Sequence, residues 1–395
     1  MWKQLVKTMD NKKKKKVILG LSGGVDSAVS AILLKNQGYD VTGMFMRNWD
    51  SFMNNDVLGN PNDFSDVCPQ EKDYMDAKET ARELGIELLR VDFINEYWEN
   101  VFSYFIDEYK NNRTPNPDIL CNSEIKFKCF LKKAMEMGAD YIAMGHYARC
   151  EKYERNGKVS YHLLKGKDDN KDQSYFLSNL KKEQFSKCLF PVGDIDKPMV
   201  RRIAEEYNIN VAKKKDSTGV CFIGERNFKL FLQNYILARP GDMKTLDGKV
   251  VGKHDGIMYY TIGQRHGLGI GGPGEAWFVI GKIAKENVLL VGQGDDQEYL
   301  YSNRCLVNRL NLIEEDFIDK LNNGETVKCQ AKFRYRQKDI EVFVKKTKDD
   351  ELEVRYPTLA RAVTPGQACV LYDGDCLIAG STINEVFMND EKRLY

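Results

Sequence analysis

A glycine- and serine-rich turn at residues 22–27 has the residue types and spacing of an anion-binding loop. The turn reads Ser22-Gly-Gly-Val-Asp-Ser27 and follows the apolar run 17–21. Its glycines let a ligand approach the backbone closely, and the helix expected to follow offers unpaired amides and the positive end of its dipole. The pattern predicts a pocket for a phosphate-type anion. No Lys-Ser/Thr pair closes the loop, which distinguishes it from a Walker A loop.

One acid lies within this predicted anion pocket. Asp26 would repel a triphosphate unless a cation accompanied it, so we expect Mg²⁺ to bind together with the nucleotide. An ordinary strand-to-helix turn is the simpler alternative, but strand, glycines, hydroxyls and helix occur here in the required order.

A second candidate site lies in the segment Thr114-Pro-Asn-Pro-Asp118-Ile-Leu-Cys121-Asn122. The two prolines stiffen the backbone around Asn116 and Asp118. We expect a helix to begin directly after Cys121, which would favour the thiolate form of this cysteine. Asp118 lies three residues earlier and is a candidate general base. A rigid loop with a chance cysteine is the alternative.

A third candidate is Cys221, which follows the basic run 213–215. Nearby positive charge favours a thiolate, although a buried cysteine between Val220 and Phe222 explains the composition equally well. The chain has ten cysteines but no C-x-x-C pair, which argues against a zinc knuckle or a thioredoxin-like motif.

Further polar segments have the composition of ligand-binding or RNA-binding surfaces. Gly145-His146-Tyr147 follows a predicted strand, Lys171-Asp-Gln173 opens a predicted helix, and Arg265-His266 lies among glycines. Basic and aromatic residues alternate over 332–338, which suits RNA contact on a β-barrel, although a solvated strand face would look the same.

The elements that must position these residues alternate between strand and helix patterns up to about residue 222. Strands are expected at 17–21, 41–46, 87–93 and 141–144, and helices at 26–37, 72–84, 96–110 and 125–137. This alternation predicts an α/β fold with a doubly wound parallel sheet, and such sheets bind ligands at the carboxyl ends of their strands.

From residue 226 the pattern changes to short strands separated by glycine-, asparagine- and aspartate-rich turns. It predicts a helix over 227–236, a small β-rich central region, and a C-terminal β-barrel with strands near 326–333, 340–345 and 368–372. We therefore expect three domains, at 1–225, 226–298 and 299–395.

Composition is that of a globular protein, with 42% hydrophobic and 30% charged residues and a net charge of +1. A nucleic acid would have to be held by local basic patches, because the chain has no strong overall positive charge. No apolar run reaches membrane-spanning length and no signal-peptide core is present, so we expect no membrane association and mostly reduced thiols.

In this order, the segments resemble those of the tRNA-specific 2-thiouridylase family, within the N-type ATP pyrophosphatase superfamily. The resemblance covers nearly the whole chain. It rests on 22–27, on Phe45-Met-Arg-Asn-Trp49, on 113–122 with its Pro-Asn-Pro-Asp-x-x-Cys pattern, and on 145–147, 171–175, 216–224 and 260–265. Arg47 departs from the expected Lys but keeps the charge.

The resemblance implies a tRNA-uridine 2-sulfurtransferase that consumes ATP. The 2-oxygen of the wobble uridine would be adenylated, and Cys221 would carry a persulfide that delivers sulfur. Cys121 would then release that sulfur and close a Cys121–Cys221 disulfide, with Asp118 as the base near the uridine. The two cysteines are 100 positions apart, so only the fold can bring them together. The uridine must also leave the anticodon stack to reach a protein pocket.

The same resemblance assigns two sets of binding residues. The nucleotide would be bound by Gly20, Leu21, Ser22, Gly23, Gly24, Val25, Asp26, Ser27, Met46 and Gly145. The tRNA would be contacted by Asn116, Pro117, Asp118, His146, Lys171, Asp172, Gln173, Arg334, Tyr335 and Gln367.

Partners and location are implied in the same way. The substrates would be ATP with Mg²⁺ and the wobble-uridine tRNAs for Lys, Glu and Gln, with no stable metal centre. A cysteine desulfurase or relay protein would donate persulfide sulfur. We expect a monomer in the bacterial cytoplasm, a mitochondrial location being the lesser alternative.

Three rival interpretations remain at this point. Another ATP pyrophosphatase, such as an amide-forming or lysidine synthetase, would not need Cys121 and Cys221. A non-catalytic tRNA-binding protein would use the loop only to sense nucleotide. An iron–sulfur thiolase would need a third cluster ligand, and none has convincing spacing.

Overall fold

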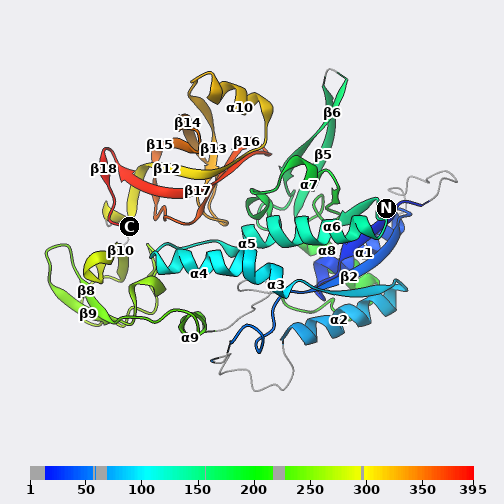
Figure 1. Cartoon of the computed structure of the whole chain (residues 1–395), viewed down its shortest axis with the longest axis horizontal. Helices are drawn as coiled ribbons and strands as arrows, with labels where there is room; N and C mark the ends of the chain where they lie inside the picture. Colours follow the sequence, from blue (N-terminus) through cyan, green and yellow to red (C-terminus); the bar gives the residue numbers. More distant parts are fainter. Residues whose placement is uncertain (1–13, 57, 59–68, 156, 217–226, 295–297) are drawn as a thin grey trace. The chain divides into compact units, whose positions relative to one another are not determined.

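The chain divides into two compact units in a computed structural model that describes residues 14–56, 58, 69–155, 157–216, 227–294 and 298–395 (Figure 1). The first unit comprises Met1–Val101, Pro117–Asn227 and Asp375–Leu377. The second comprises Phe102–Asn116, Phe228–Gly374 and Ile378–Tyr395. The predicted division into three domains is a different partition and stays a prediction.

The first unit is built on a five-stranded sheet with the order β3-β2-β1-β4-β7. Its strands are β1 (Lys16–Gly20), β2 (Asp40–Arg47), β3 (Leu88–Asp92), β4 (Tyr141–Ala143) and β7 (Cys188–Leu189). Every neighbouring pair is parallel. The predicted α/β fold with a parallel sheet is therefore confirmed.

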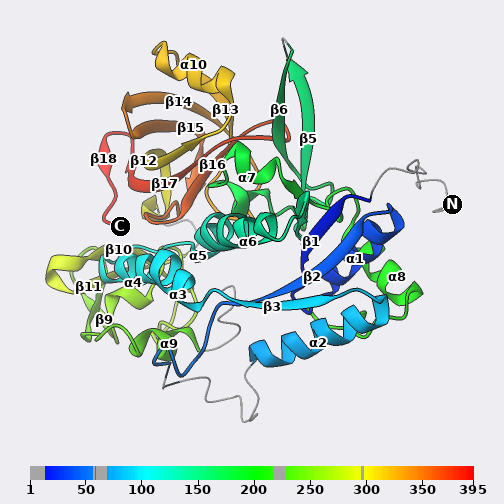
Figure 2. The same cartoon turned by 45° about the vertical axis from the view of Figure 1, so that its right-hand side comes forward.

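Helices α1 (Val25–Asn36), α2 (Pro69–Leu84) and α8 (Lys197–Glu206) accompany this sheet (Figure 2). One face of α1, including Ala31 and Leu34, packs on the β1 residues Val17 and Leu19. The opposite face packs on Val200, Ile203 and Ala204 of α8. Helix α1 is thus buried on both sides, which fixes the turn that leads into it.

Two helical runs contain wide π-helical turns. Helix α3 (Ile94–Tyr97), η2 (Trp98–Phe102) and α4 (Ser103–Lys110) follow one another without a break. Helix α5 (Pro117–Leu120) likewise continues through η3 (Cys121–Cys129) into α6 (Phe130–Glu136).

The expectation that a helix begins after Cys121 is wrong. The helical run begins at Pro117, because a proline is well suited to the first helical turn. The thiol therefore lies beyond that turn, where the helix dipole has little effect.

The first unit also holds elements that the sequence patterns did not indicate. Strands β5 (Ala148–Arg155) and β6 (Lys158–Lys165) form an antiparallel hairpin in register from Ala148↔Lys165 to Arg155↔Lys158. The short helix α7 (Lys182–Phe185) follows, after η4 (Ser174–Leu177), which begins directly after Gln173 where a helix was expected. Cys376, the first residue of β17, pairs with Leu164 of β6.

The second unit contains a four-stranded sheet with the order β10-β11-β8-β9. These strands are β8 (Gly241–Lys244), β9 (Val250–His254), β10 (Trp277–Ile283) and β11 (Val288–Gln293), preceded by α9 (Phe228–Gln233). The short helices η5 (Ile257–Tyr259), η6 (Ala284–Glu286) and η7 (Glu298–Leu300) connect them to neighbouring segments. The core of this region includes Met243, Phe278 and Val291.

The predicted C-terminal β-barrel is confirmed. Six strands follow the order β12-β15-β14-β13-β16-β17, and β12 also pairs with β17, which closes the barrel. Their bounds are β12 (Tyr301–Leu312), β13 (Val327–Lys332), β14 (Ile340–Lys348), β15 (Glu351–Arg361), β16 (Ala368–Asp373) and β17 (Cys376–Met388), with α10 (Glu315–Asn322) between β12 and β13 and a two-residue β18 (Glu391–Lys392) paired to β17. Among the described residues, none of the helices combines the length and apolar character needed to traverse a bilayer.

Candidate functional site

The turn at 22–27 connects β1 to α1 at the carboxyl edge of the parallel sheet. Gly23 has φ +75°, and a Cβ there would lie 2.1 Å from the Asp73 carbonyl oxygen, so this position requires glycine. Gly24 caps α1 without any side-chain hydrogen bond to the helix amides. The first amides of α1 are therefore not capped by that residue, as an anion site requires.

Two serine hydroxyls hold the turn in shape. The Ser27 hydroxyl donates to the Gly24 carbonyl oxygen at 2.9 Å and accepts from the Ser22 amide at 3.2 Å. The Ser22 and Ser27 hydroxyl oxygens lie 3.2 Å apart. The predicted loop is thus preorganised by its own side chains.

Glycines also mark where neighbouring strand ends approach the loop. A Cβ on Gly145 would lie 2.9 Å from the Ser27 amide nitrogen, so the end of β4 packs directly on the first turn of α1. A Cβ on Gly20 would lie 2.7 Å from the sulfur of Met144 and 3.5 Å from Cε of Met46. Met46 is buried beside Gly20 of β1, and its contact with the nucleotide stays a prediction.

Asp26 is not a lone acid. Its carboxylate accepts hydrogen bonds from Nζ of Lys197 at 2.7 and 2.9 Å and from the Tyr147 hydroxyl at 2.8 Å. Burial, followed by the charge of Asp26, raises the pKa of Tyr147, so the phenol stays a donor. The sequence analysis missed Lys197, since it lies 171 positions from Asp26 and belongs to no motif.

A second carboxylate continues this network. Asp216 pairs with Lys197, Lys171 and Arg201 at 2.7, 2.7 and 2.8 Å. Burial acts to raise the pKa of Asp216, but hydrogen bonds from Lys171 and Lys197 outweigh it and lower the pKa to about 2. Five charged side chains therefore link the anion loop to the chain just before residues 217–226.

Lys214 supports the loop from another direction. Its Nζ donates to the Gly23 carbonyl oxygen at 2.9 Å and pairs with Asp73 and Asp76 at 2.7 and 2.6 Å. Burial acts to lower its pKa, but the hydrogen bonds to both carboxylates prevail and raise it. Lys214 thus stays charged and ties α2 to the anion loop.

Of the two cysteines predicted to act together, only Cys121 lies among the described residues. Cys121 is fully buried in the helical run 117–136, and Asp118 lies in its first turn. The next residue, Asn122, donates its amide to the Phe176 carbonyl oxygen at 3.0 Å, which fixes the helix against η4. Cys221 lies outside the described residues.

His146 bridges the loop region and this helix. It follows Gly145, is 9% exposed, and its ring packs against Phe127 of η3 at a centroid distance of 5.8 Å. Burial, with a smaller effect of Lys126, lowers its pKa well below the usual value, so the imidazole is neutral. Its Nδ1 is buried without a hydrogen-bond partner among the described residues.

The neighbouring predicted tRNA contacts Asp172 and Gln173 have internal partners. The Asp172 carboxylate is 3% exposed and accepts from the amides of Gly166 and Ser174 at 3.1 and 3.0 Å. The Gln173 side chain accepts from the Tyr147 amide at 3.0 Å. Both residues shape the chain around Tyr147, and their contact with tRNA stays a prediction.

In the second unit, the segment 112–116 that precedes the cysteine helix is tightly bonded. The Gln367 amide donates to the carbonyl oxygens of Thr114 and Pro115 at 2.7 and 3.3 Å. Arg113 pairs with Glu108 at 2.7 Å and also donates to the Ile383 carbonyl oxygen at 2.9 Å.

Buried Lys282 adds another bond to this segment. Its Nζ donates to the Asn112 carbonyl oxygen at 3.0 Å. Burial lowers the pKa of Lys282 to about 7, and its side chain is one that the sequence analysis did not single out.

Two more predicted tRNA contacts lie after β13. Arg334 donates to the carbonyl oxygens of Ile262 and Ala362, both at 2.9 Å, and Tyr335 is half-buried. Arg334 therefore joins segments within the second unit, and its contact with tRNA stays a prediction.

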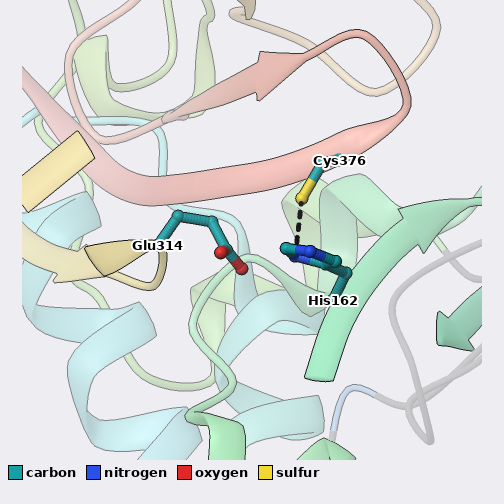
Figure 3. Close-up of side chains that lie close together, drawn as sticks. All are labelled: His162, Glu314 and Cys376. Carbon is teal, nitrogen blue, oxygen red and sulfur yellow. Dashed lines mark hydrogen bonds between the residues drawn. The ribbon is translucent and has the colours of Figure 1, made fainter. Parts of the chain in front are cut away.

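A cysteine–histidine contact lies away from the loop. In Figure 3 the Cys376 thiol faces the His162 ring, with 3.5 Å between Sγ and Nδ1. The His162 ring also stacks on Tyr153 at 3.9 Å. Both cysteine and histidine belong to the first unit, whereas Glu314 in the same view belongs to the second, so we assign no metal centre there.

Comparisons with known proteins cover almost the whole chain. Family models described as tRNA methyl transferase HUP domain, tRNA methyl transferase PRC-barrel domain and aminomethyltransferase beta-barrel domain match residues 15–225, 229–293 and 304–383. The chain is 54% identical over 380 residues to the tRNA-specific 2-thiouridylase MnmA of Staphylococcus aureus strains JH9 and Newman, covering 96% of this chain and 98% of each relative. A solved 4-thiouridine synthetase–RNA complex with bound ATP is 14% identical with TM-score 0.33, covering 56% of this chain and 50% of that one.

Proposed function

Because this chain belongs to the tRNA-specific 2-thiouridylase family, we propose that it replaces the 2-oxygen of the wobble uridine of tRNA with sulfur, using ATP. One observation in the first unit carries this proposal. The consecutive residues Gly145 and His146 touch the anion loop at Ser27 and the cysteine helix at Phe127. The anion loop and a thiol-bearing helix thus both lie against the segment that follows β4, which suits activation followed by sulfur transfer.

ATP fits the loop as a substrate. The glycine turn, the α1 amides and the Ser22 hydroxyl offer donors to the pyrophosphate part, while the Ser27 hydroxyl holds the turn, and Met46 and Gly145 lie beside them. We propose that residues 20–27 bind the nucleotide with Mg²⁺. The uridine 2-oxygen attacks the α-phosphorus and pyrophosphate leaves, which converts that oxygen into part of a good leaving group.

Sulfur transfer then uses the two cysteines. The terminal sulfur of a Cys221 persulfide attacks C2 of the activated uridine, and AMP leaves with the former 2-oxygen. The Cys121 thiolate attacks Sγ of Cys221, so the transferred sulfur stays on C2 and a Cys121–Cys221 disulfide forms. Asp118 takes the uridine proton. A thiol reductant then restores both cysteines, and a persulfide donor reloads Cys221.

The tRNA substrates follow from the same proposal. We assign uridine and anticodon contacts to Asn116, Pro117, Asp118 and His146, with Lys171, Asp172, Gln173, Arg334, Tyr335 and Gln367 binding other parts of the tRNA. The proposed substrates are the tRNAs for Lys, Glu and Gln. The proposed setting is a monomer in the bacterial cytoplasm, acting with a cysteine desulfurase or relay protein.

The test is a complete reaction with ATP, a persulfide donor and tRNA, followed by mass spectrometry of the anticodon nucleosides. We expect 2-thiouridine with the unmodified chain and none with Cys121→Ser or Cys221→Ser. Cys129→Ser is the matched control, because Cys129 lies on the same helical run as Cys121. A methylated uridine in place of a thiolated one, or full activity of either serine variant, would contradict the proposal.

A further inference from the structure

Lys197 belongs to no sequence motif, yet several contacts hold both its backbone and its side chain. It is the first residue of α8, where Asp196 caps the helix through the Met199 amide at 2.8 Å. Its own backbone amide donates to Asp168 at 2.9 Å. Only 12% of its side chain is exposed. Both its backbone and its side chain are therefore fixed in the folded chain.

The Lys197 ammonium group bridges two carboxylates. It pairs with Asp26 inside the anion loop and, at 2.7 Å, with Asp216. Helix packing enforces this bridge, since Val200 and Ile203 of α8 lie against the α1 residues that follow Asp26. The core between the two helices therefore holds the backbone of Lys197 close to the loop.

The charges explain why the loop needs such a group. Asp26 by itself places a negative charge next to the site for a polyphosphate, and a bare carboxylate there opposes binding. Lys197 neutralises that charge, and the Tyr147 hydroxyl donates a further hydrogen bond to the same carboxylate. Lys171 and Arg201 likewise pair with Asp216, so neither of the two carboxylates bonded to Lys197 is left as an unpaired negative charge.

We propose that Lys197 is a positioning residue for the nucleotide: it neutralises Asp26 and holds it against Tyr147, so that the loop accepts the polyphosphate of ATP even without a divalent cation. This inference rests on the proposed binding of ATP by the loop. It differs from a direct lysine–phosphate contact, because the effect of Lys197 on binding should depend on the charge of Asp26.

The test is a double-mutant cycle read by calorimetric titration of the full chain with ATP in EDTA, without tRNA or sulfur donor. Lys197→Met should weaken ATP binding at least about tenfold, since it exposes the Asp26 charge. Asp26→Asn should bind at least as well as the unmodified chain. In that background Lys197→Met should change the affinity less than about threefold.

The controls separate this inference from the proposed function. Lys167→Met removes another lysine of the same unit, one with an exposed ion pair to Asp194, and should leave ATP binding unchanged. Melting curves of each variant check folding. Equal weakening by Lys197→Met in both backgrounds, or none in either, would overturn the inference while ATP binding stands. If the unmodified chain fails to bind ATP with or without Mg²⁺, both the inference and the nucleotide step fail. If the double-mutant cycle gives the expected affinities but the chain does not thiolate tRNA, the result would contradict the proposed function and not this inference.

Discussion

Replacing Lys282 by methionine should make the stability of this protein less dependent on pH. Lys282 lies in β10, is 6% exposed, and has its pKa lowered to about 7 by burial. Its Nζ donates to the Asn112 carbonyl oxygen at 3.0 Å. Methionine keeps the length of the apolar stem but can neither titrate nor donate this hydrogen bond.

The sign and size of the effect follow from the two protonation states. In the unfolded chain a lysine keeps its ordinary pKa of about 10.4, whereas folded Lys282 loses its proton near pH 7. Between these values the unfolded state binds more protons, so the free energy of unfolding rises with pH. Integrated from pH 7 to pH 9, the gain is about 2 kcal/mol for the unmodified chain and absent for Lys282→Met.

The measurement is urea unfolding of both proteins at pH 6, 7, 8 and 9, with the difference between them taken at each pH so that other titrating groups cancel. We expect Lys282→Met to gain relative stability below pH 7 and to lose that advantage steadily above it. Lys285→Met, an exposed neighbour, should show no such trend. A constant difference across this range would refute a buried lysine that is neutral above pH 7.

Three further predictions concern the loop, the segment before the cysteine helix, and the ionic network. Gly145→Ala should weaken ATP binding at least about tenfold in a titration, because its Cβ would lie 2.9 Å from the Ser27 amide nitrogen, whereas Gly271→Ala, with no atom within 4 Å, should not. Gln367→Ala should weaken tRNA binding about tenfold in a titration, since it removes a proposed tRNA contact together with two internal hydrogen bonds to Thr114 and Pro115; an unchanged Kd with a slower rate of thiolation would contradict the contact and leave Gln367 with an internal role alone. The pKa of Asp216 is about 2, so its contribution to stability is complete above about pH 4 and is lost as pH falls toward 2. The Tm difference between the unmodified chain and Asp216→Asn should therefore shrink on acidification from pH 5 to pH 3, and a constant difference would contradict the ion-pair network.

The parts of the fold that could be predicted from the sequence are those determined by residues close together in the chain. A buried apolar strand, a glycine turn and an amphipathic run are each contained within about 20 residues, so β1, the turn after it and α1 were predicted correctly, whereas the binding of an anion by that turn stays a prediction. The glycine-, asparagine- and aspartate-rich turns between the barrel strands could be predicted for the same reason. The start of the cysteine helix was misplaced because Pro117 was treated as a stiffener of a loop and not as a first-turn residue.

The contacts that complete the site could not be predicted, since they depend on packing between distant segments. Lys197 reaches Asp26 across 171 positions, and Gln367 reaches Thr114 across 253. Neither lysine nor glutamine is unusual where it stands in the sequence. The hairpin of β5 and β6 was missed for another reason: the β5 run 151–155 is mostly charged and gives little sign of a strand, although Val159, Tyr161 and Leu163 alternate with polar residues in β6.

The division of the chain into two units has a consequence for how the protein is made. The polypeptide passes from one unit to the other five times, the last two at Asp375–Leu377. During synthesis β6 therefore cannot pair with Cys376 until almost the entire chain has left the ribosome. Neither unit can be excised by a single cut, and a ribosome-bound chain that ends before residue 375 should still lack part of the first unit. Loss of the last twenty or so residues would thus remove part of the first unit, although nearly all of that unit is encoded earlier.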